Sequence, residues 1–372
     1  MATHAPTRSG PIRHGKRLAG ALATAAAVAL AAGGAAAQQD QVKVGFIYVG
    51  PVGDHGWTYR HDVGRQDVEE ALGDAVETSY VESVSEGADA ERVIRQMAQT
   101  GHDLIFTTSF GFMNPTVRVA EDFPDVKFEH ATGYKRADNV ATYAARFYEG
   151  RYVIGKVVGH MTESNLIGYI GAYPIPEVIR GINAFTRGMR SVNPDAEVRV
   201  IWANTWYDPG KEADAARALI DQGADVILQH TDSPAPVQVA QERGVYAIGQ
   251  ASDMDRFGPD AHLTAIIDDW SGYYIDRTQA VLDGTWESQD TWGGFDSGMV
   301  VLAEWDPAIP EDVVAEAEAT REAIESGEMH PFDGPVINQA GEEVIPAGET
   351  LSDEDLLSMD YYVEGVQGSI PQ

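Results

Sequence analysis

From residue 42 onward the chain alternates short apolar runs with longer helical stretches, and this alternation limits the fold more than any other feature. The runs are rich in β-branched and aromatic residues, as strands are. Most of them are nearly continuous, which indicates strands of a parallel sheet that is covered on both faces. We expect strands at residues 43–49, 76–82, 103–109, 126–132, 166–172, 197–203, 225–231, 245–251 and 263–268.

Helical segments separate these strands, for example at residues 88–101, 143–161 and 176–192. Two stretches resemble each other: "ADAERVIRQMAQTGHDLIFTT" (88–108) and "ADAARALIDQGADVILQHT" (213–231). Both contain Ala-Asp-Ala-x-Arg, a glycine after the helix and an aspartate that opens a strand. The match is short enough to arise by chance, but it favours two similar α/β lobes over one long sheet.

The first 37 residues have a different composition. Basic residues at positions 8, 13, 16 and 17 precede a charge-free, alanine-rich run that ends in Ala35-Ala36-Ala37. This pattern predicts a secretory signal peptide that is cleaved near Ala37. A membrane anchor is the alternative, but the apolar run is short and a Gly-Gly pair interrupts it. We therefore expect an exported mature protein that is not inserted in a membrane.

The formal net charge is −32, from 58 acidic and 26 basic residues. A surface of this charge repels nucleic acid and anionic lipid, so neither is an expected partner. The chain has no cysteine, which excludes disulfides, zinc–thiolate sites and cysteine nucleophiles. Nothing in the sequence points to an oligomer, and a monomer is the default expectation.

Aromatic residues gather in the loops that follow the predicted strands. In parallel α/β sheets ligands bind beyond the carboxyl ends of the strands, so these loops should border a cleft between the lobes. Any one of these side chains alone could simply pack locally. Together they favour a planar or ring-shaped ligand. The residues are Trp57, Tyr59, Phe110, Phe112, Tyr134, Tyr173, Trp206 and Tyr207.

The same loops lack the motifs of enzymes. They contain no G-x-S-x-G, H-E-x-x-H, phosphate-binding or dinucleotide-binding glycine pattern, so we expect neither a metal nor a cofactor. Four aspartates could act as acids or bases, but helix capping and hydrogen bonding to a ligand are the favoured interpretations. They are Asp54, Asp208, Asp232 and Asp253. An exported two-lobed protein of this kind is most simply a binding protein.

Several longer stretches resemble one known family. They are "RFYEGRYVIGKVVG", "IGYIGAYPIPEVIRGINAFTRGMRSVNP", "TWYDPGKEADAARALIDQGADVI" and "LLSMDYYVEGVQG". The chain is similar here to the BMP (basic membrane protein) family of ABC-transporter substrate-binding proteins. The resemblance implies a type I periplasmic binding protein, with two Rossmann-like lobes, a three-stranded hinge and a purine nucleoside or nucleobase as ligand. It also implies an ABC permease as partner and a periplasmic location.

The resemblance also implies particular site residues. Family members carry D-x-S-F-N and S-F-x-D-P, whose phenylalanines sandwich the purine, and these positions here hold Trp57 and Trp206. Asp54 occupies the first aspartate of the pattern. Phe110 and Tyr173 lie in neighbouring loops, and we include both in the expected site.

Two ribose-binding groups of the family are missing in this register. The aspartate of G-V-D is replaced by Ala251, and the lysine after L-T-S-x-x is replaced by Asp268. The departure points to a free base, adenine first, with Gln250, Asp232 and Asp253 as candidates for its edge. A purine nucleoside binder and a sugar-binding protein of the same fold are the alternatives. An exported nucleoside-cleaving enzyme and a ligand sensor are more distant ones.

The domain organisation follows from the same resemblance. We expect the N-terminal lobe at residues 42–136 and 253–285, and the C-terminal lobe at 137–252 and 286–305. Residues 306–372, with one acidic amphipathic helix followed by turns and short strands, are expected to form a family-specific extension that packs over the lobes.

Overall fold

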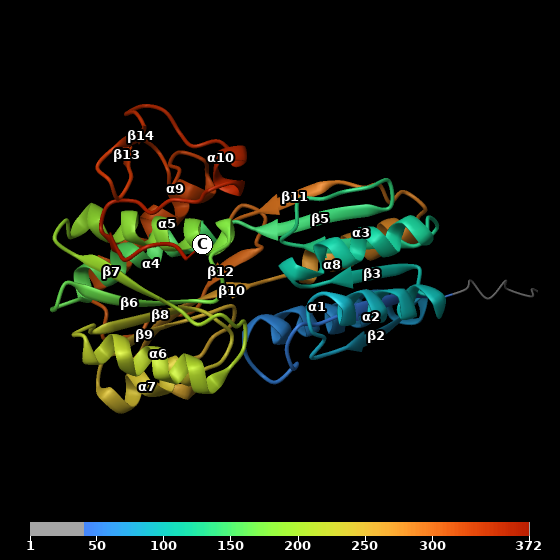
Figure 1. Cartoon of the computed structure of the whole chain (residues 1–372), viewed down its shortest axis with the longest axis horizontal. Helices are drawn as coiled ribbons and strands as arrows, with labels where there is room; N and C mark the ends of the chain where they lie inside the picture. Colours follow the sequence, from blue (N-terminus) through green and yellow to red (C-terminus); the bar gives the residue numbers. More distant parts are fainter. Residues whose placement is uncertain (1–40, 372) are drawn as a thin grey trace, which may run out of the picture. The chain divides into compact units, whose positions relative to one another are not determined.

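Two sheets form the framework of the protein in the computed structural model, which describes residues 41–371 (Figure 1). In the first sheet the strands are all parallel and lie in the order β11-β5-β4-β3-β1-β2. Its strands are β1 (Val42–Ile47), β2 (Val76–Val81), β3 (Leu104–Thr107), β4 (Lys127–Ala131), β5 (Val140–Ala145) and β11 (Asp290–Gly293). The predicted signal segment, 1–37, lies outside the described residues.

The second sheet has the order β12-β10-β9-β8-β6-β7-β15, in which β12 runs antiparallel to β10 and the other neighbours are parallel. Its strands are β6 (Leu166–Gly171), β7 (Glu197–Trp202), β8 (Val226–His230), β9 (Tyr246–Gly249), β10 (His262–Asp268), β12 (Val300–Leu302) and β15 (Val366–Gln367). The order β2-β1-β3-β4-β5 of the first sheet recurs as β7-β6-β8-β9-β10. The two similar sequence stretches end in β3 and β8, which hold matching places, so the prediction of two similar α/β lobes is confirmed.

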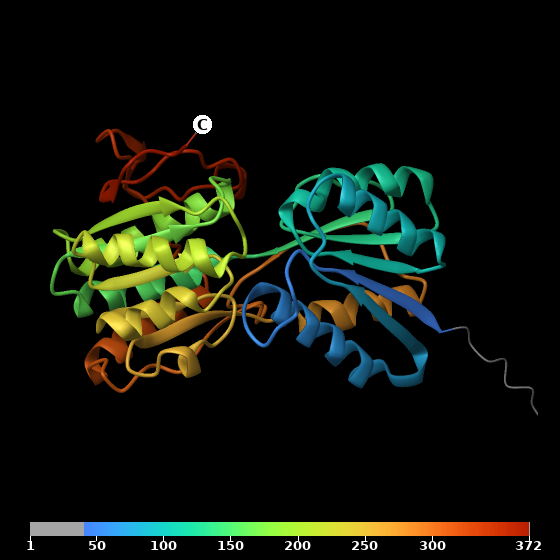
Figure 2. The same ribbon diagram turned by 60° about the horizontal axis from the view of Figure 1, so that its bottom comes forward.

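Helices cover both faces of each sheet, which explains why the strands are nearly continuous apolar runs. Figure 2 shows α1 and α8 on one face of the first sheet and α2 and α3 on the other, and in the second lobe α4 packs on α5 and α6 on α7. The helices are α1 (Gly56–Leu72), α2 (Ala88–Gln99), α3 (Met113–Asp122), α4 (Phe147–Met161), α5 (Pro176–Val192), α6 (Pro209–Asp221), α7 (Ala235–Arg243), α8 (Ser271–Leu282), α9 (Glu311–Glu325) and α10 (Asp353–Leu357), with short 3₁₀ turns η1 (Gly73–Ala75), η2 (Phe110–Phe112) and η3 (Asp255–Phe257).

The expected helix at 143–161 is wrong at its beginning. Residues up to Ala145 belong to β5, which pairs with β4 and β11, and α4 begins only at Phe147. Strand β5 lies between β4 and β11, and all of its residues except Ala144 are buried. Sequence alone did not separate this strand from the helix that follows it without a turn.

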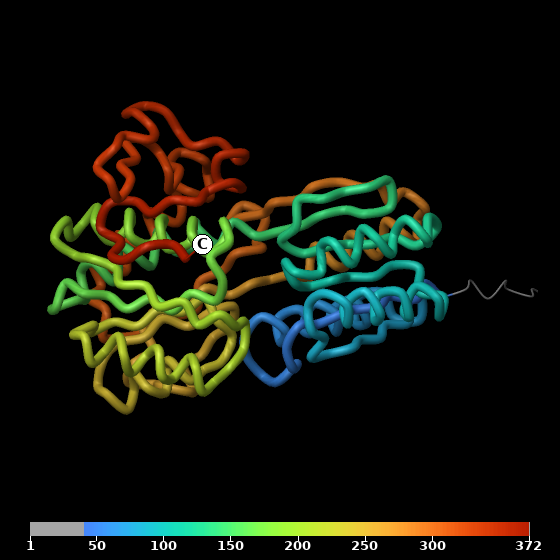
Figure 3. Tube along the Cα trace, in the orientation of Figure 1, coloured from blue at the N-terminus to red at the C-terminus, as the bar shows by residue number. Residues whose placement is uncertain are grey.

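The chain crosses between the lobes after β5, after β10 and after β11, as the trace in Figure 3 allows the reader to follow. These three crossings form the hinge expected for the fold. They also correct the predicted lobe boundaries, because β5 and β11 pair in the first sheet and β10 pairs in the second. The register between Thr142 and Asp290 depends on partners far apart in sequence, which local patterns do not reveal.

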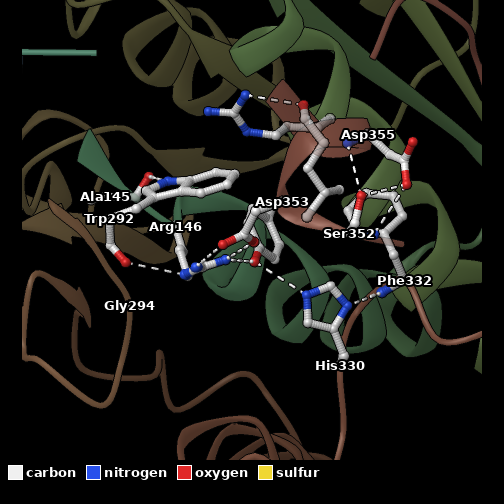
Figure 4. Close-up of polar contacts among 12 residues, drawn as sticks. Ala145, Arg146, Trp292, Gly294, His330, Phe332, Ser352, Asp353 and Asp355 are labelled. Carbon is white, nitrogen blue, oxygen red and sulfur yellow. Dashed lines mark hydrogen bonds and ion pairs between the residues drawn. The ribbon is translucent and has the colours of Figure 1, made fainter. Parts of the chain in front are cut away.

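The C-terminal segment is attached to both the second lobe and the hinge. Helix α9 packs on α4, β13 (Val336–Ile337) pairs with β14 (Glu343–Ile345), and β15 extends the second sheet beside β7. Figure 4 shows Arg146, at the crossing from β5 to α4, beside the first residue of α10. Its guanidinium donates two hydrogen bonds of 2.7 Å to Asp353 and lies 4.3 Å from the ring centre of Trp292. These contacts join α10 to the hinge.

Candidate functional site

Trp57 lies at the first turn of α1, where the chain comes within contact distance of the second lobe. The preceding Gly56 has φ +78° and donates its N–H to the Ser252 hydroxyl at 2.7 Å. A Cβ at this glycine would lie 2.7 Å from the carbonyl oxygen of Asp232. Both the left-handed backbone and the close approach therefore require glycine here.

The indole of Trp57 is held by neighbours in the first lobe and by the first residue of α4. Its N–H donates to the carbonyl oxygen of Thr108 at 2.7 Å. Its ring meets Trp270 edge-on at 5.5 Å between centroids, and Phe147 at 6.1 Å. The ring is thus anchored on one side and only partly buried, which leaves surface for a ligand.

Trp206 belongs to the second lobe, in the loop between β7 and α6. Its ring packs edge-on against Tyr173 at 5.3 Å. Its indole N–H donates to the carboxylate of Glu86, a first-lobe residue, at 3.3 Å. Glu86 also accepts hydrogen bonds from the Ser109 hydroxyl and the Gly111 backbone. The two lobes therefore meet through the side chain that was expected to stack on the ligand.

Both tryptophans line one small cavity. Its walls come from the ends of strands and the starts of helices in both lobes, as the fold predicts. The lining residues are Val49, Trp57, Ser109, Phe110, Thr132, Glu177, Trp206, His230, Asp232 and Gln250.

Polar groups of the second lobe occupy one part of this wall. Gln250 is buried, and its side-chain oxygen accepts a hydrogen bond from Arg151, which leaves the amide nitrogen as a donor. Burial and then the Glu212 carboxylate raise the pKa of Asp232 well above its usual value, whereas the backbone N–H of Trp57 lowers it. Asp232 therefore tends toward the neutral acid, which can both donate and accept.

Glu177 and His230 form a second polar contact of the wall. Both are buried, at 8% and 6% exposed, and a carboxylate oxygen of Glu177 lies 3.6 Å from Nε2 of His230. Burial lowers the pKa of His230, and the nearby Glu177 carboxylate acts in the opposite direction. The neutral imidazole and the carboxylate provide one donor or acceptor and one acceptor next to the cavity.

The structure brings together five of the eight predicted site residues: Trp57, Phe110, Trp206, Asp232 and Gln250 all line the cavity. Tyr173 packs on Trp206 and lines a neighbouring cavity instead.

Asp54 and Asp253 do not line the cavity. The side chain of Asp54 is 63% exposed and pairs with Arg256 at 2.6 Å. Asp253 is 55% exposed and accepts a hydrogen bond from the backbone of Asp255. Asp208 accepts a hydrogen bond from the backbone N–H of Lys211 at the start of α6, so its interpretation as a helix cap is confirmed.

Sequence reasoning missed Glu177 and His230. Glu177 follows the predicted strand 166–172 in a Pro-x-Pro-Glu turn, and His230 is the last residue of β8, one position before the end of the predicted strand 225–231. Both positions follow the rule that ligands lie beyond strand ends. The signal that could have revealed these two site residues was a polar side chain at or just beyond the end of an apolar strand.

The two positions that carry ribose-binding groups in the family stay away from the cavity wall. Ala251 is buried with φ +60°, and Asp268 is fully buried. Neither is among the residues that line the cavity. Burial raises the pKa of Asp268 well above its usual value, and its carboxylate oxygens have no hydrogen-bond partner within residues 41–371.

Two observations bear on other classes of protein. Within residues 41–371, no group of three or more histidines, aspartates or glutamates is placed to hold a metal ion. Across the same described residues, no helix combines the length and the apolar character needed to cross a membrane.

Comparison with known proteins identifies the family. Residues 41–330 match the family described as Bmp, ABC transporter substrate-binding protein PnrA-like. The chain belongs to this family. The family consists of solute-binding proteins, so the expectation that the protein is not an enzyme is confirmed.

Individual relatives agree with this assignment. The purine-binding protein BAB2_0673 of Brucella abortus is 58% identical, over 91% of this chain and 97% of its own length. A Haloferax volcanii protein, TsgA13, whose name describes it as glucose-binding, is 42% identical over 91% of this chain and 84% of its own length.

Solved structures agree on the fold. A solute-binding protein from Aeropyrum pernix has a TM-score of 0.69 at 20% identity, over 79% of this chain and 94% of its own. One from Conexibacter woesei has a TM-score of 0.62 at 25% identity, over 78% of this chain and 98% of its own. The expected type I periplasmic binding-protein fold is confirmed.

Proposed function

We propose that this ABC transporter substrate-binding protein captures a free purine base, adenine first, in the cavity between its lobes. The observation that carries the proposal is the pair of tryptophans, Trp57 from the first lobe and Trp206 from the second, on the wall of one small cavity. Flat aromatic ligands gain stacking energy from such side chains. The purine-binding name of the 58% identical relative supports the same ligand class.

Binding proceeds by closure of the lobes on the base. Contacts to both lobes favour the closed arrangement because they exist only when the lobes meet. Glu86, which accepts the Trp206 indole N–H, and Ser252, which accepts the Gly56 backbone N–H, are such contacts. The closed form then delivers the base to an ABC permease.

Adenine is favoured over adenosine because neither of the two positions that hold the ribose in the family lines the cavity. Ala251 and Asp268 stand where nucleoside-binding relatives are expected to carry aspartate and lysine, and both lie off the cavity wall. A buried sugar hydroxyl without a partner costs on the order of 1–3 kcal/mol. Adenine should therefore bind at least roughly tenfold more tightly than adenosine.

We further propose that the protein is exported to the periplasm as a monomer, with cleavage near Ala37. The basic front and the Ala-x-Ala end of residues 1–37 support export. Intact mass of the protein from the periplasmic fraction should correspond to a chain that begins at Gln38. A mature protein in the inner membrane that retains residues 1–37 would contradict this.

A hexose is the second candidate ligand. The glucose-binding name of the 42% identical relative favours it, and sugars also stack on tryptophan. Calorimetry with adenine, adenosine, guanine, hypoxanthine and glucose decides among the ligands, and mass spectrometry of the ligand that co-purifies gives an independent answer. Glucose binding without purine binding would refute the proposal, and equal affinities for adenine and adenosine would refute the preference for the free base.

A further inference from the structure

The carboxylate of Glu177 is a buried group without a complete set of partners. It is 8% exposed, and its Oε2 has no hydrogen-bond partner among residues 41–371. Oε1 lies 3.6 Å from Nε2 of the neutral His230, and Oε2 lies 3.9 Å from a guanidinium nitrogen of Arg180. Both distances exceed those of good hydrogen bonds. A buried carboxylate that lacks partners is costly, so its retention needs an explanation.

The position of Glu177 in α5 explains only part of this. It lies in the first turn of the 17-residue helix, where the helix dipole favours a negative charge. The dipole supplies no hydrogen bond to Oε2, however, and the side chain borders the cavity that contains the two tryptophans. The missing partner can therefore arrive with the ligand.

The wall around Glu177 also separates two cavities. Together with Phe110 and Thr132, it lines both the tryptophan cavity and a larger neighbouring cavity. A group attached to the ligand at this point would have to pass Glu177 to enter the neighbouring cavity. Glu177 would therefore be next to the ligand nitrogen that carries a hydrogen in one kind of ligand and a substituent in the other.

We propose that Glu177 accepts a hydrogen bond from the imidazole-ring N–H of a free purine base and thereby selects bases over N9-substituted purines. The inference rests on the proposed purine function. A free base carries this N–H, whereas in a nucleoside the sugar replaces the hydrogen. A carboxylate oxygen can only accept, so it has no favourable contact with a substituted nitrogen.

The test is calorimetry with adenine and 9-methyladenine on the full mature chain freed of co-purified ligand. Wild-type protein should bind 9-methyladenine at least roughly tenfold more weakly, and Glu177→Gln should weaken adenine binding by roughly tenfold or more while changing 9-methyladenine binding by less than about threefold. The discrimination between the two ligands therefore shrinks in the variant. Glu129→Gln, a matched change at a buried carboxylate in β4 that is away from the hinge and outside the cavity wall, should leave both affinities unchanged.

Three results would overturn the inference. Equal wild-type affinities would mean that the substituent enters the neighbouring cavity past Glu177. Full discrimination retained in Glu177→Gln would mean that the methyl group is excluded by shape alone. If wild-type protein binds no purine, the proposed function fails and this inference with it. Should the variant fail to fold, as judged by thermal unfolding, Glu177→Asp takes its place: the shorter side chain withdraws the acceptor from the ligand, so the discrimination between the two ligands should shrink in the same way.

Discussion

Glu149 is a buried carboxyl group at the hinge, and its ionisation should lower the stability of the protein. It lies in the first turn of α4, is 8% exposed, and accepts a hydrogen bond of 2.8 Å from the backbone N–H of Phe295. Burial raises the pKa of Glu149 from 4.5 to about 7, and this effect outweighs the opposing contributions of the Phe295 N–H and Arg146. We predict that Glu149→Gln stabilises the protein above neutral pH.

The sign and size follow from proton linkage. Between the two pKa values the folded protein keeps a proton that the unfolded chain releases, so the free energy of unfolding falls as pH rises from 4.5 to about 7. At 1.36 kcal/mol for each pH unit, the loss approaches about 3 kcal/mol and persists at higher pH. Glutamine retains an oxygen for the Phe295 N–H but cannot ionise, so it removes this loss.

Urea unfolding of wild type and Glu149→Gln at several pH values measures the effect. The variant should be more stable by up to about 3 kcal/mol near about pH 8, and the difference should shrink toward about pH 4. Exposed Glu70→Gln is the control and should show a difference within about 0.5 kcal/mol at every pH. A stability difference that does not change with pH, or a variant less stable than wild type near about pH 8, would refute the reasoning.

Three further predictions concern the site. Trp57→Ala or Trp206→Ala should each weaken adenine binding by roughly 5- to 100-fold, as measured by tryptophan fluorescence and calorimetry, and wild-type affinity in both would refute the sandwich. Asp54→Asn removes an exposed ion pair with Arg256, so adenine affinity should change by no more than about fivefold in calorimetry; a larger loss would mean that Asp54 contacts the ligand after all. Gly56→Ala places a Cβ 2.7 Å from the Asp232 carbonyl at φ +78°, so closure should cost on the order of 1–3 kcal/mol and affinity should fall accordingly, whereas unchanged affinity would show that the lobes need not approach this closely.

The amino-acid sequence by itself determined the class of fold and the neighbourhood of the site. Continuous apolar runs separated by helical segments specify parallel strands covered on both faces, because local period and composition carry that information. The strand ends then place Trp57 and Trp206 in loops on the same side of their sheets, and the structure puts both on one cavity wall.

Only the tertiary structure decided which strands share a sheet and which polar groups reach the cavity. β5 joins β11 through residues some 150 positions apart, such as Thr142 and Asp290, and no local pattern encodes such a pairing. Asp54 turns to the surface because Arg256 of the other lobe pairs with it there. Glu177 reaches the cavity because α5 begins beside the end of β8, where His230 lies. Side-chain direction and burial depend on these long-range contacts, and therefore on the complete fold.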